Sequence, residues 1–166
     1  MIIFRRLVTA TSMLAVSACG NQRTLVSSLA GEKIPAPRAT PTAEDANHTR
    51  QVIIEHSNVR NWQEAIRNTS DVAFSKVDQI VDLSPLTEMQ RLEVIDIAFN
   101  DYSEQQLLPL TRVKSLRVAL IEGNSLTQSF IDALGRLPSM HLIYHGGSFS
   151  CPMRPGLSCA GAGGKP

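Results

Sequence analysis

Two histidines near the C-terminal end come closest to a catalytic or metal-binding pattern. His141 and His145 lie four residues apart in a segment predicted to be a strand. This separates their backbones by roughly 13 Å at about 3.3 Å per residue. They cannot easily share one metal ion, and His145 is better explained as a core histidine with satisfied hydrogen bonds. The pair therefore does not predict a metal site.

The other polar residues offer no convergent catalytic set. The sequence HGGS at residues 145–148 resembles the oxyanion loop of esterases, but no Gly-x-Ser-x-Gly elbow accompanies it. The acidic residues are scattered and are expected to be solvated surface: Asp78, Asp82, Glu88, Glu93 and Asp101. The sequence predicts a protein that is not an enzyme and has no cofactor. A hydrolase acting on cell-wall or lipid material stays as a disfavoured alternative.

The N-terminal residues have the layout of a secretory signal. Arg5 and Arg6 form a short basic start, and a mostly apolar run follows from Leu7 to Val16. This run is too short for a permanent membrane-spanning helix. The next residues, VSAC at positions 16–19, resemble a bacterial lipobox. The alternative is an ordinary signal peptide with a chance cysteine.

The lipobox resemblance implies a lipid anchor on Cys19. Residues 1–18 would be removed as a lipoprotein signal peptide, and Cys19 would carry lipid on its sulfur and its amino group. Several acyl chains hold a protein firmly to a bilayer, whereas a single chain holds it weakly. Gly20 rather than aspartate follows the cysteine, which in such lipoproteins favours the outer membrane, facing the periplasm. The predicted location is therefore the bacterial cell envelope.

The charge of the mature chain argues against nucleic acid as a partner. The whole chain has 16 Lys and Arg against 15 Asp and Glu. Removing residues 1–18 removes two arginines and no acid, which leaves 14 basic residues (16 minus 2) and a net charge of −1. The mature chain therefore has no excess of positive charge that would attract nucleic acid. The remaining 148 residues (166 minus 18) suffice for one domain.

The remaining cysteines, Cys151 and Cys159, predict a disulfide. An even pair in an oxidising compartment is typical of a disulfide that closes a small loop, and Pro152, Pro155 and Gly156 supply its turn. A zinc site is disfavoured because no histidine pair is nearby. Residues 151–166 are thus expected to be a disulfide loop and a mobile Gly-rich tail. Residues 19–45, which contain three prolines, are expected to be a flexible tether.

The middle of the chain repeats with a period of 24 residues. LEVIDIAFN begins at Leu92, LRVALIEGN at Leu116 and MHLIYHGGS at Met140. The shared pattern L-x-x-L-x-L-x-x-N resembles the leucine-rich repeat. Two fainter copies precede these: one places Thr49, Val52 and Ile54 at the first three pattern positions, and the other Thr69, Val72 and Phe74.

This resemblance implies a short α/β solenoid of about five repeats over residues 46–150, with parallel strands alternating with short helices. The pattern residues are expected to point into the core, and the asparagines Asn100 and Asn124 to satisfy backbone groups where the chain turns. Three segments have helix caps at their starts: Asn61, Ser103 with Gln106, and Thr127. The end repeats are expected to be irregular caps.

The residues between the pattern positions would form the concave face of such a solenoid. The first repeat is expected to contribute Gln51, Ile53 and Glu55. The later repeats contribute apolar side chains with acids at their margin, and contiguous exposed apolar surface usually marks a contact site. The predicted partner-binding residues are Val94, Asp96, Val118, Leu120, Glu122, Leu142 and Tyr144. Alternatively, the tether or the cysteine loop lies across this face.

These observations predict a lipid-anchored, non-enzymatic protein that binds a protein partner of unidentified kind through the concave face. A second interpretation is a structural lipoprotein subunit of an envelope assembly, such as a secretion machine. In that case the apolar face would be permanently buried between subunits.

Overall fold

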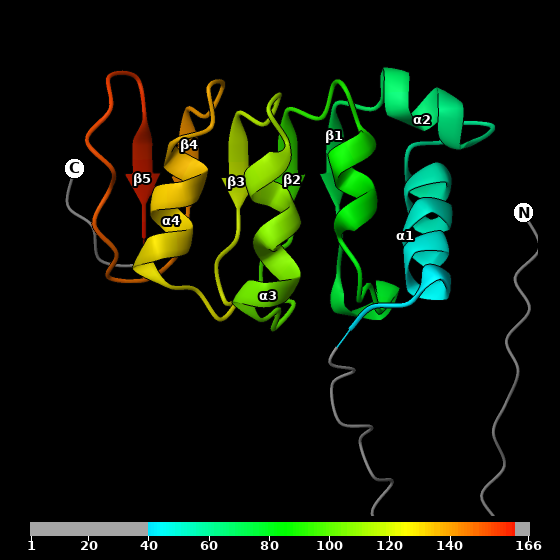
Figure 1. Ribbon diagram of the computed structural model, residues 1–166, viewed down its shortest axis with the longest axis horizontal. Helices are drawn as coiled ribbons and strands as arrows, with labels where there is room; N and C mark the ends of the chain where they lie inside the picture. The colour runs from blue at the N-terminus through cyan, green and yellow to red at the C-terminus, as the bar shows by residue number, and fades with distance from the viewer. Residues whose placement is uncertain (1–39, 162–166) are drawn as a thin grey trace, which may run out of the picture. The chain divides into compact units, whose positions relative to one another are not determined.

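The computed structural model describes residues 40–161, which form one α/β domain (Figure 1). Five strands form a single all-parallel sheet in the order β1-β2-β3-β4-β5. The strands are β1 (Asp71–Ala73), β2 (Val94–Asp96), β3 (Val118–Leu120), β4 (Leu142–Tyr144) and β5 (Ser158–Ala160). The predicted signal peptide, Cys19, the predicted tether up to residue 39 and the predicted tail from residue 162 lie outside the described residues.

The strand register follows the 24-residue period of the sequence. Val94 pairs with Val118, and Val118 pairs with Leu142. The step from Asp71 to Val94 is one residue shorter. Parallel strands need a crossover connection, which short helices usually supply. In Figure 1, α3 (Glu104–Leu107) and α4 (Gln128–Gly135) lie on the same side of the sheet, in front of the strands.

Local capping chemistry sets where these helices begin. Thr127 accepts a hydrogen bond from the backbone N–H of Phe130 at the start of α4, and Asn61 caps α2 (Trp62–Asn68) in the same way. Ser103 and Gln106 form the predicted capping box of α3. Three 3-10 helices complete the connections: Lys76–Asp78, Ser84–Glu88 and Leu108–Arg112. Proline near the start of the last two suits a first helical turn.

The repeat pattern fills the core in four of the five predicted repeats. In these four repeats, each of the three places that the pattern L-x-x-L-x-L-x-x-N assigns to leucine holds a buried residue. This includes the two polar residues at such places, Thr69 and His145. The fully buried set comprises Leu92, Ile95, Ile97, Leu116, Ala119, Ile121 and Ile143. Helical residues Phe130, Ile131 and Leu134 pack on the same core, as their spacing predicted. Burial of these apolar side chains is the main stabilising term of the domain.

The two repeat asparagines hold the turns that follow the strands. Asn100 donates from Nδ2 to the carbonyls of Phe74 and Ala98, at 2.8 Å and 3.1 Å. Asn124 donates to the carbonyls of Ile97 and Ile121 at 2.9 Å, and its Oδ1 accepts from the N–H of Tyr102. Each asparagine therefore satisfies backbone groups of two neighbouring repeats, as the pattern predicted.

The first predicted repeat is wrong in its secondary structure. Residues 43–56 form the helix α1 (Ala43–His56), which begins at a capping box of Thr42 and Asp45. Its buried residues Thr49, Val52 and Ile53 have helical spacing. Gln51, Ile53 and Glu55 therefore do not lie on a strand face, and the domain begins at α1 rather than at residue 46. The predicted tether correspondingly ends before Ala43.

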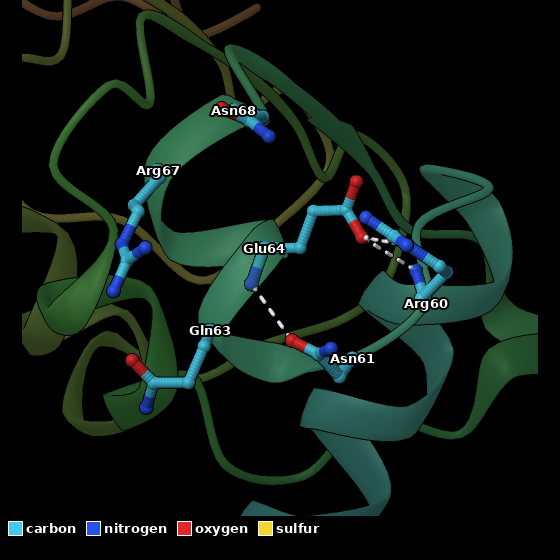
Figure 2. A pocket seen from close by; sticks show the side chains of 6 residues that line it. All are labelled: Arg60, Asn61, Gln63, Glu64, Arg67 and Asn68. Carbon is cyan, nitrogen blue, oxygen red and sulfur yellow. Dashed lines mark hydrogen bonds and ion pairs between the residues drawn. The ribbon is translucent and has the colours of Figure 1, made fainter.

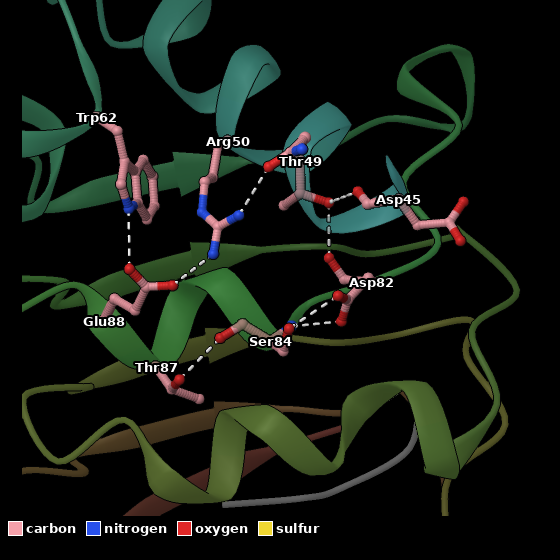
Figure 3. Close-up of polar contacts among 9 residues, drawn as sticks. Asp45, Thr49, Arg50, Trp62, Asp82, Ser84, Thr87 and Glu88 are labelled. Atoms are coloured by element: carbon pink, nitrogen blue, oxygen red, sulfur yellow. Dashed lines mark hydrogen bonds and ion pairs between the residues drawn. The ribbon is translucent and has the colours of Figure 1, made fainter. Parts of the chain in front are cut away.

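Polar contacts attach α1 to the rest of the domain (Figure 3). Thr49 Oγ1 donates to the carbonyl of Asp82 at 2.6 Å in a buried position. Arg50 pairs with Glu88 at 2.8 Å, and Trp62 Nε1 donates to the same carboxylate at 2.9 Å. His56 Nδ1 lies 3.4 Å from the carbonyl oxygen of Ala73 in β1. The helix thus covers the β1 end of the sheet.

The fifth strand comes from the C-terminal segment. Cys151 and Cys159 form the predicted disulfide, with Cα atoms 5.5 Å apart. However, residues 158–160 form β5 and pair with β4, where a loop and tail had been expected. The step from Leu142 to Ser158 is 16 residues, so this unit is shorter than a full repeat. Arg154 fixes the loop by donating to the carbonyls of Gly135, Leu137 and Pro138.

Candidate functional site

The outer face of the sheet is the side opposite the buried core. Two rows of side chains cross it, because residues at the ends of each three-residue strand point away from the central buried one. One row contains Val94, Val118 and Leu142, and the other contains Asp96, Leu120 and Tyr144. Each member of a row is the direct register partner of the next. The structure therefore brings together six of the seven predicted partner-binding residues.

The middle of the outer face is apolar and half-buried. In β2, β3 and β4 the central residues are fully buried, whereas Val94, Val118, Leu120, Leu142 and Tyr144 keep part of their surface in solvent. Neighbouring strands lie about 4.8 Å apart, so side chains in register on this face lie side by side. Contiguous apolar surface of this kind is typical of a contact site.

Glu122, the seventh predicted residue, lies beyond the end of β3. The backbone ladder continues to it, because the N–H of Phe99 donates to its carbonyl at 2.7 Å. Its side chain extends over Gly146, which has a φ of 66° and where an added Cβ would lie 2.3 Å from Glu122 Cγ. The absence of a side chain at position 146 therefore leaves room for this carboxylate.

β5 changes the position of the apolar rows within the sheet. Ser158 pairs with Leu142, and Ala160 pairs with Tyr144. The apolar rows therefore lie inside the sheet rather than at its last strand. On the other side, Asp71 and Ala73 of β1 continue the same rows. Small and polar residues thus border the apolar patch on both sides.

Sequence reasoning missed Phe99, which is prominent at the carboxyl end of β2. Its φ is 58°, a conformation that bulky residues rarely adopt. The residue is 58% exposed, and its ring lies against Gly123, the equivalent residue of the next repeat. The sequence signal was Gly123 itself, since a glycine at that repeat position indicates a positive φ.

One described cavity lies away from the outer face, around α2 (Figure 2). It has a volume of about 340 Å³ and is lined by Arg60, Asn61, Gln63, Glu64, Arg67 and Asn68. Glu64 accepts hydrogen bonds from the backbone and side chain of Arg60, which lower the pKa of its carboxyl. The carboxylate is therefore held in its ionised, paired form, and Asn61 caps the helix. This cavity has no nucleophile with an adjacent base.

The two histidines have separate environments. His145 is 5% exposed, accepts a hydrogen bond from the N–H of Gly147 and packs edge-on against Phe149. Burial lowers the pKa of its imidazole. His141 precedes β4 and is exposed, with Nδ1 near the carbonyl of Ser139. Within residues 40–161 there is no group of three His, Cys, Asp or Glu side chains that could hold a metal ion.

No protein-family model, curated protein or solved structure matches the chain. Among the described residues, no helix is both long and apolar enough to cross a bilayer. The outer face is therefore the candidate functional site on the basis of its own geometry and composition.

Proposed function

We propose that this chain is a lipid-anchored protein of the bacterial envelope whose domain is a short leucine-rich-repeat solenoid. The solenoid binds a protein partner through the outer face. The observation that supports the proposal is the pair of largely apolar rows on the outer face. The stability of an isolated domain does not require apolar side chains on a solvated face. A strand with one solvated face normally alternates apolar and polar residues, and β2, β3 and β4 depart from that rule.

Three features support the solenoid. Strands β2, β3 and β4 follow a 24-residue step in register, the pattern positions from residue 69 onward that are leucine in the repeat are buried, and Asn100 and Asn124 bridge successive turns. Atypical terminal units are also expected in a repeat protein, because an end must present a different surface from an inner repeat. The helix α1 at one end and the short unit of β5 at the other fit this requirement.

The anchor is supported by the lipobox residues 16–19 and the signal before them. We expect Cys19→Ser to abolish the incorporation of labelled fatty acid and to leave the precursor uncleaved by the lipoprotein peptidase. Metabolic labelling followed by gel analysis of the wild type and the variant measures both. Normal labelling of the variant would exclude the anchor without affecting the proposal for the outer face.

Two consecutive residues, the last of β3 and the one that follows it, provide a matched test of the binding face. Leu120 lies on the outer face and Ile121 in the core. We expect Leu120→Lys combined with Tyr144→Lys to keep the melting temperature within a few degrees of wild type. Ile121→Lys buries an unpaired charge, so it should cost several kcal/mol and unfold the domain.

Partner contact is measured by photo-crosslinking in cells. A photoreactive amino acid is placed at Val118 on the outer face and, as a control, at exposed Arg136 after α4. We expect a discrete crosslinked product from position 118 alone, abolished by Leu120→Lys with Tyr144→Lys. Crosslinking that survives in the folded double variant would refute the binding face. A product that captures nearly all of the protein would favour a permanent subunit of an envelope assembly.

A further inference from the structure

The outer face carries charge of one sign only. Three carboxylates occupy this face: Asp71 in β1, Asp96 in β2, and Glu122 two residues after the end of β3. The remaining positions are apolar, small or hydroxyl-bearing: Ala73, Ser75, Val94, Ala98, Val118, Leu120, Leu142, Tyr144 and Gly146, with Ser158 and Ala160 of β5. No lysine, arginine or histidine occupies a described position of these rows. The face is therefore an apolar patch with three formal negative charges.

These carboxylates differ in their partners from several others of the domain. Glu88, Glu93 and Asp101 each pair with a lysine or arginine elsewhere on the surface. Within residues 40–161 the three outer-face carboxylates take part in no ion pair. Asp96 accepts only from the N–H of Ala98 at 3.1 Å, and Asp71 only from the hydroxyl of Ser70 at 2.7 Å.

Position makes Asp96 the most informative of the three. It lies in a row between Ala73 and Leu120, and it is half-buried. Water still reaches this half-buried side chain when the face is free. When a partner covers the face, that water leaves, and an unpaired carboxylate becomes costly. A cation from the partner offsets this cost. The face therefore selects a partner that carries a positive charge over one that is only apolar.

We infer that the segment that binds the outer face is a cationic, apolar stretch of a partner protein. Its apolar side chains cover Val118, Leu120 and Leu142, and a lysine or arginine reaches Asp96 or Glu122. The inference rests on the proposed function and names the chemistry of the partner. Anionic partners, including nucleic acids and acidic lipid headgroups, are repelled by the three carboxylates.

The test selects binders without knowing the natural partner. A random peptide library displayed on phage is panned on the full chain, purified in detergent. The selected peptides are synthesised, and their affinities for wild type and variants are measured by fluorescence anisotropy. Asp96→Asn with Glu122→Gln is the charge-removing variant, in which the amide oxygen at position 96 can still accept from Ala98. Leu120→Lys with Tyr144→Lys identifies the peptides that bind the outer face.

Peptides that the Leu120→Lys with Tyr144→Lys variant no longer binds should carry apolar residues together with lysine or arginine. Their affinity should fall about tenfold in the charge-removing variant. It should also weaken as salt rises from about 50 mM to about 500 mM. Outer-face peptides without basic enrichment, whose affinity is unchanged by Asp96→Asn with Glu122→Gln, would overturn this inference and leave the proposed function intact. Selected peptides that all bind elsewhere would overturn both.

Discussion

At the β1 end of the sheet the chain places a helix, whereas at the β4 end it adds the strand β5 and links it covalently to the preceding loop. Both ends face the same physical problem. A repeated parallel sheet leaves its outermost strand with open backbone groups and its core with an uncovered side. The two solutions differ in what holds them, which predicts that they fail under different conditions.

The β1 end is held by noncovalent contacts that are continuous with the core. Val52 and Ile53 of α1 belong to the same apolar cluster as the strands. Thr49 supplies a buried hydrogen bond, and Arg50 packs against the Trp62 ring at 5.7 Å while pairing with Glu88 (Figure 3). Because apolar burial dominates here, loss of α1 should expose the core of the whole domain.

The β4 end relies on local links. The Cys151–Cys159 disulfide closes the loop before β5, and Arg154 ties that loop to the carbonyls at the end of α4. Leu157 and Cys159 are only partly buried against the core. Apolar burial thus contributes less to stability at the β4 end, where a covalent link offsets the difference, whereas the β1 end needs no such link.

Removing the buried anchor of α1 should have the largest effect. We expect Ile53→Ala to lower the free energy of unfolding by about 3 kcal/mol, because Ile53 is 1% exposed and its truncation leaves a cavity. Its neighbour Ile54 is only partly buried and serves as the control. Chemical denaturation of both variants measures the difference. A larger cost for Ile54→Ala would indicate the strand that the repeat pattern had predicted for this segment.

The error at α1 shows what the repeat pattern could not decide. Thr49, Val52 and Ile54 fit the repeat positions, but Thr49, Val52 and Ile53 fit a helix equally well. Local signals favoured the helix: the Thr42 capping box with Asp45 precedes it. The strand interpretation followed from extending a period that had become weak. At the end of the sheet the neighbouring repeat is missing, so local propensity outweighs the pattern.

The inner repeats were predictable because one physical constraint acts on every copy. Each pattern side chain must fill the same core, so burial preserves the period, and strand alternation then assigns the outer-face rows. The fifth strand was not predictable in this way. Ser158, Cys159 and Ala160 carry no pattern, and their pairing depends on the open edge of β4 and the disulfide. The exposure of Phe99 depends on a backbone angle that its own residue type does not indicate.

Removing the disulfide should have a smaller and more local effect. For Cys151→Ser with Cys159→Ser we expect a loss of about 2.5 kcal/mol, from the entropy of closing a loop with a sequence separation of 8. Hydrogen exchange measured by mass spectrometry should rise in β5 and β4 and stay near wild type in α1 and β1. Reduction of the wild type with a thiol reagent is the matched control. Equal loss of protection in α1 would show that the two ends are one cooperative unit.

The smallest expected effect is a difference between the two ends in the pH at which each loses stability. Burial lowers the pKa of His145 below its ordinary 6.5, so the folded state binds this proton less readily than the unfolded state. The stability that its neutral form contributes is complete above 6.5 and is lost as the pH falls from there through the lowered value. At the other end, the Arg50 guanidinium and the Trp62 indole lower the pKa of Glu88 below 4.5. That contribution is lost only in the more acidic range.

Acidification should therefore loosen the β4 end first. The backbone N–H of His145 donates to Ala160 in β5 at 2.9 Å, and its ring lies beside Gly161. Between about pH 7.5 and about pH 5, hydrogen exchange corrected for its intrinsic rate should increase in β5 before it increases in α1. In His145→Asn the amide oxygen can still accept from Gly147, but it does not titrate, so the pH dependence of β5 in this range should disappear. A variant that keeps the wild-type pH profile would assign the effect to another group and remove this distinction between the two ends.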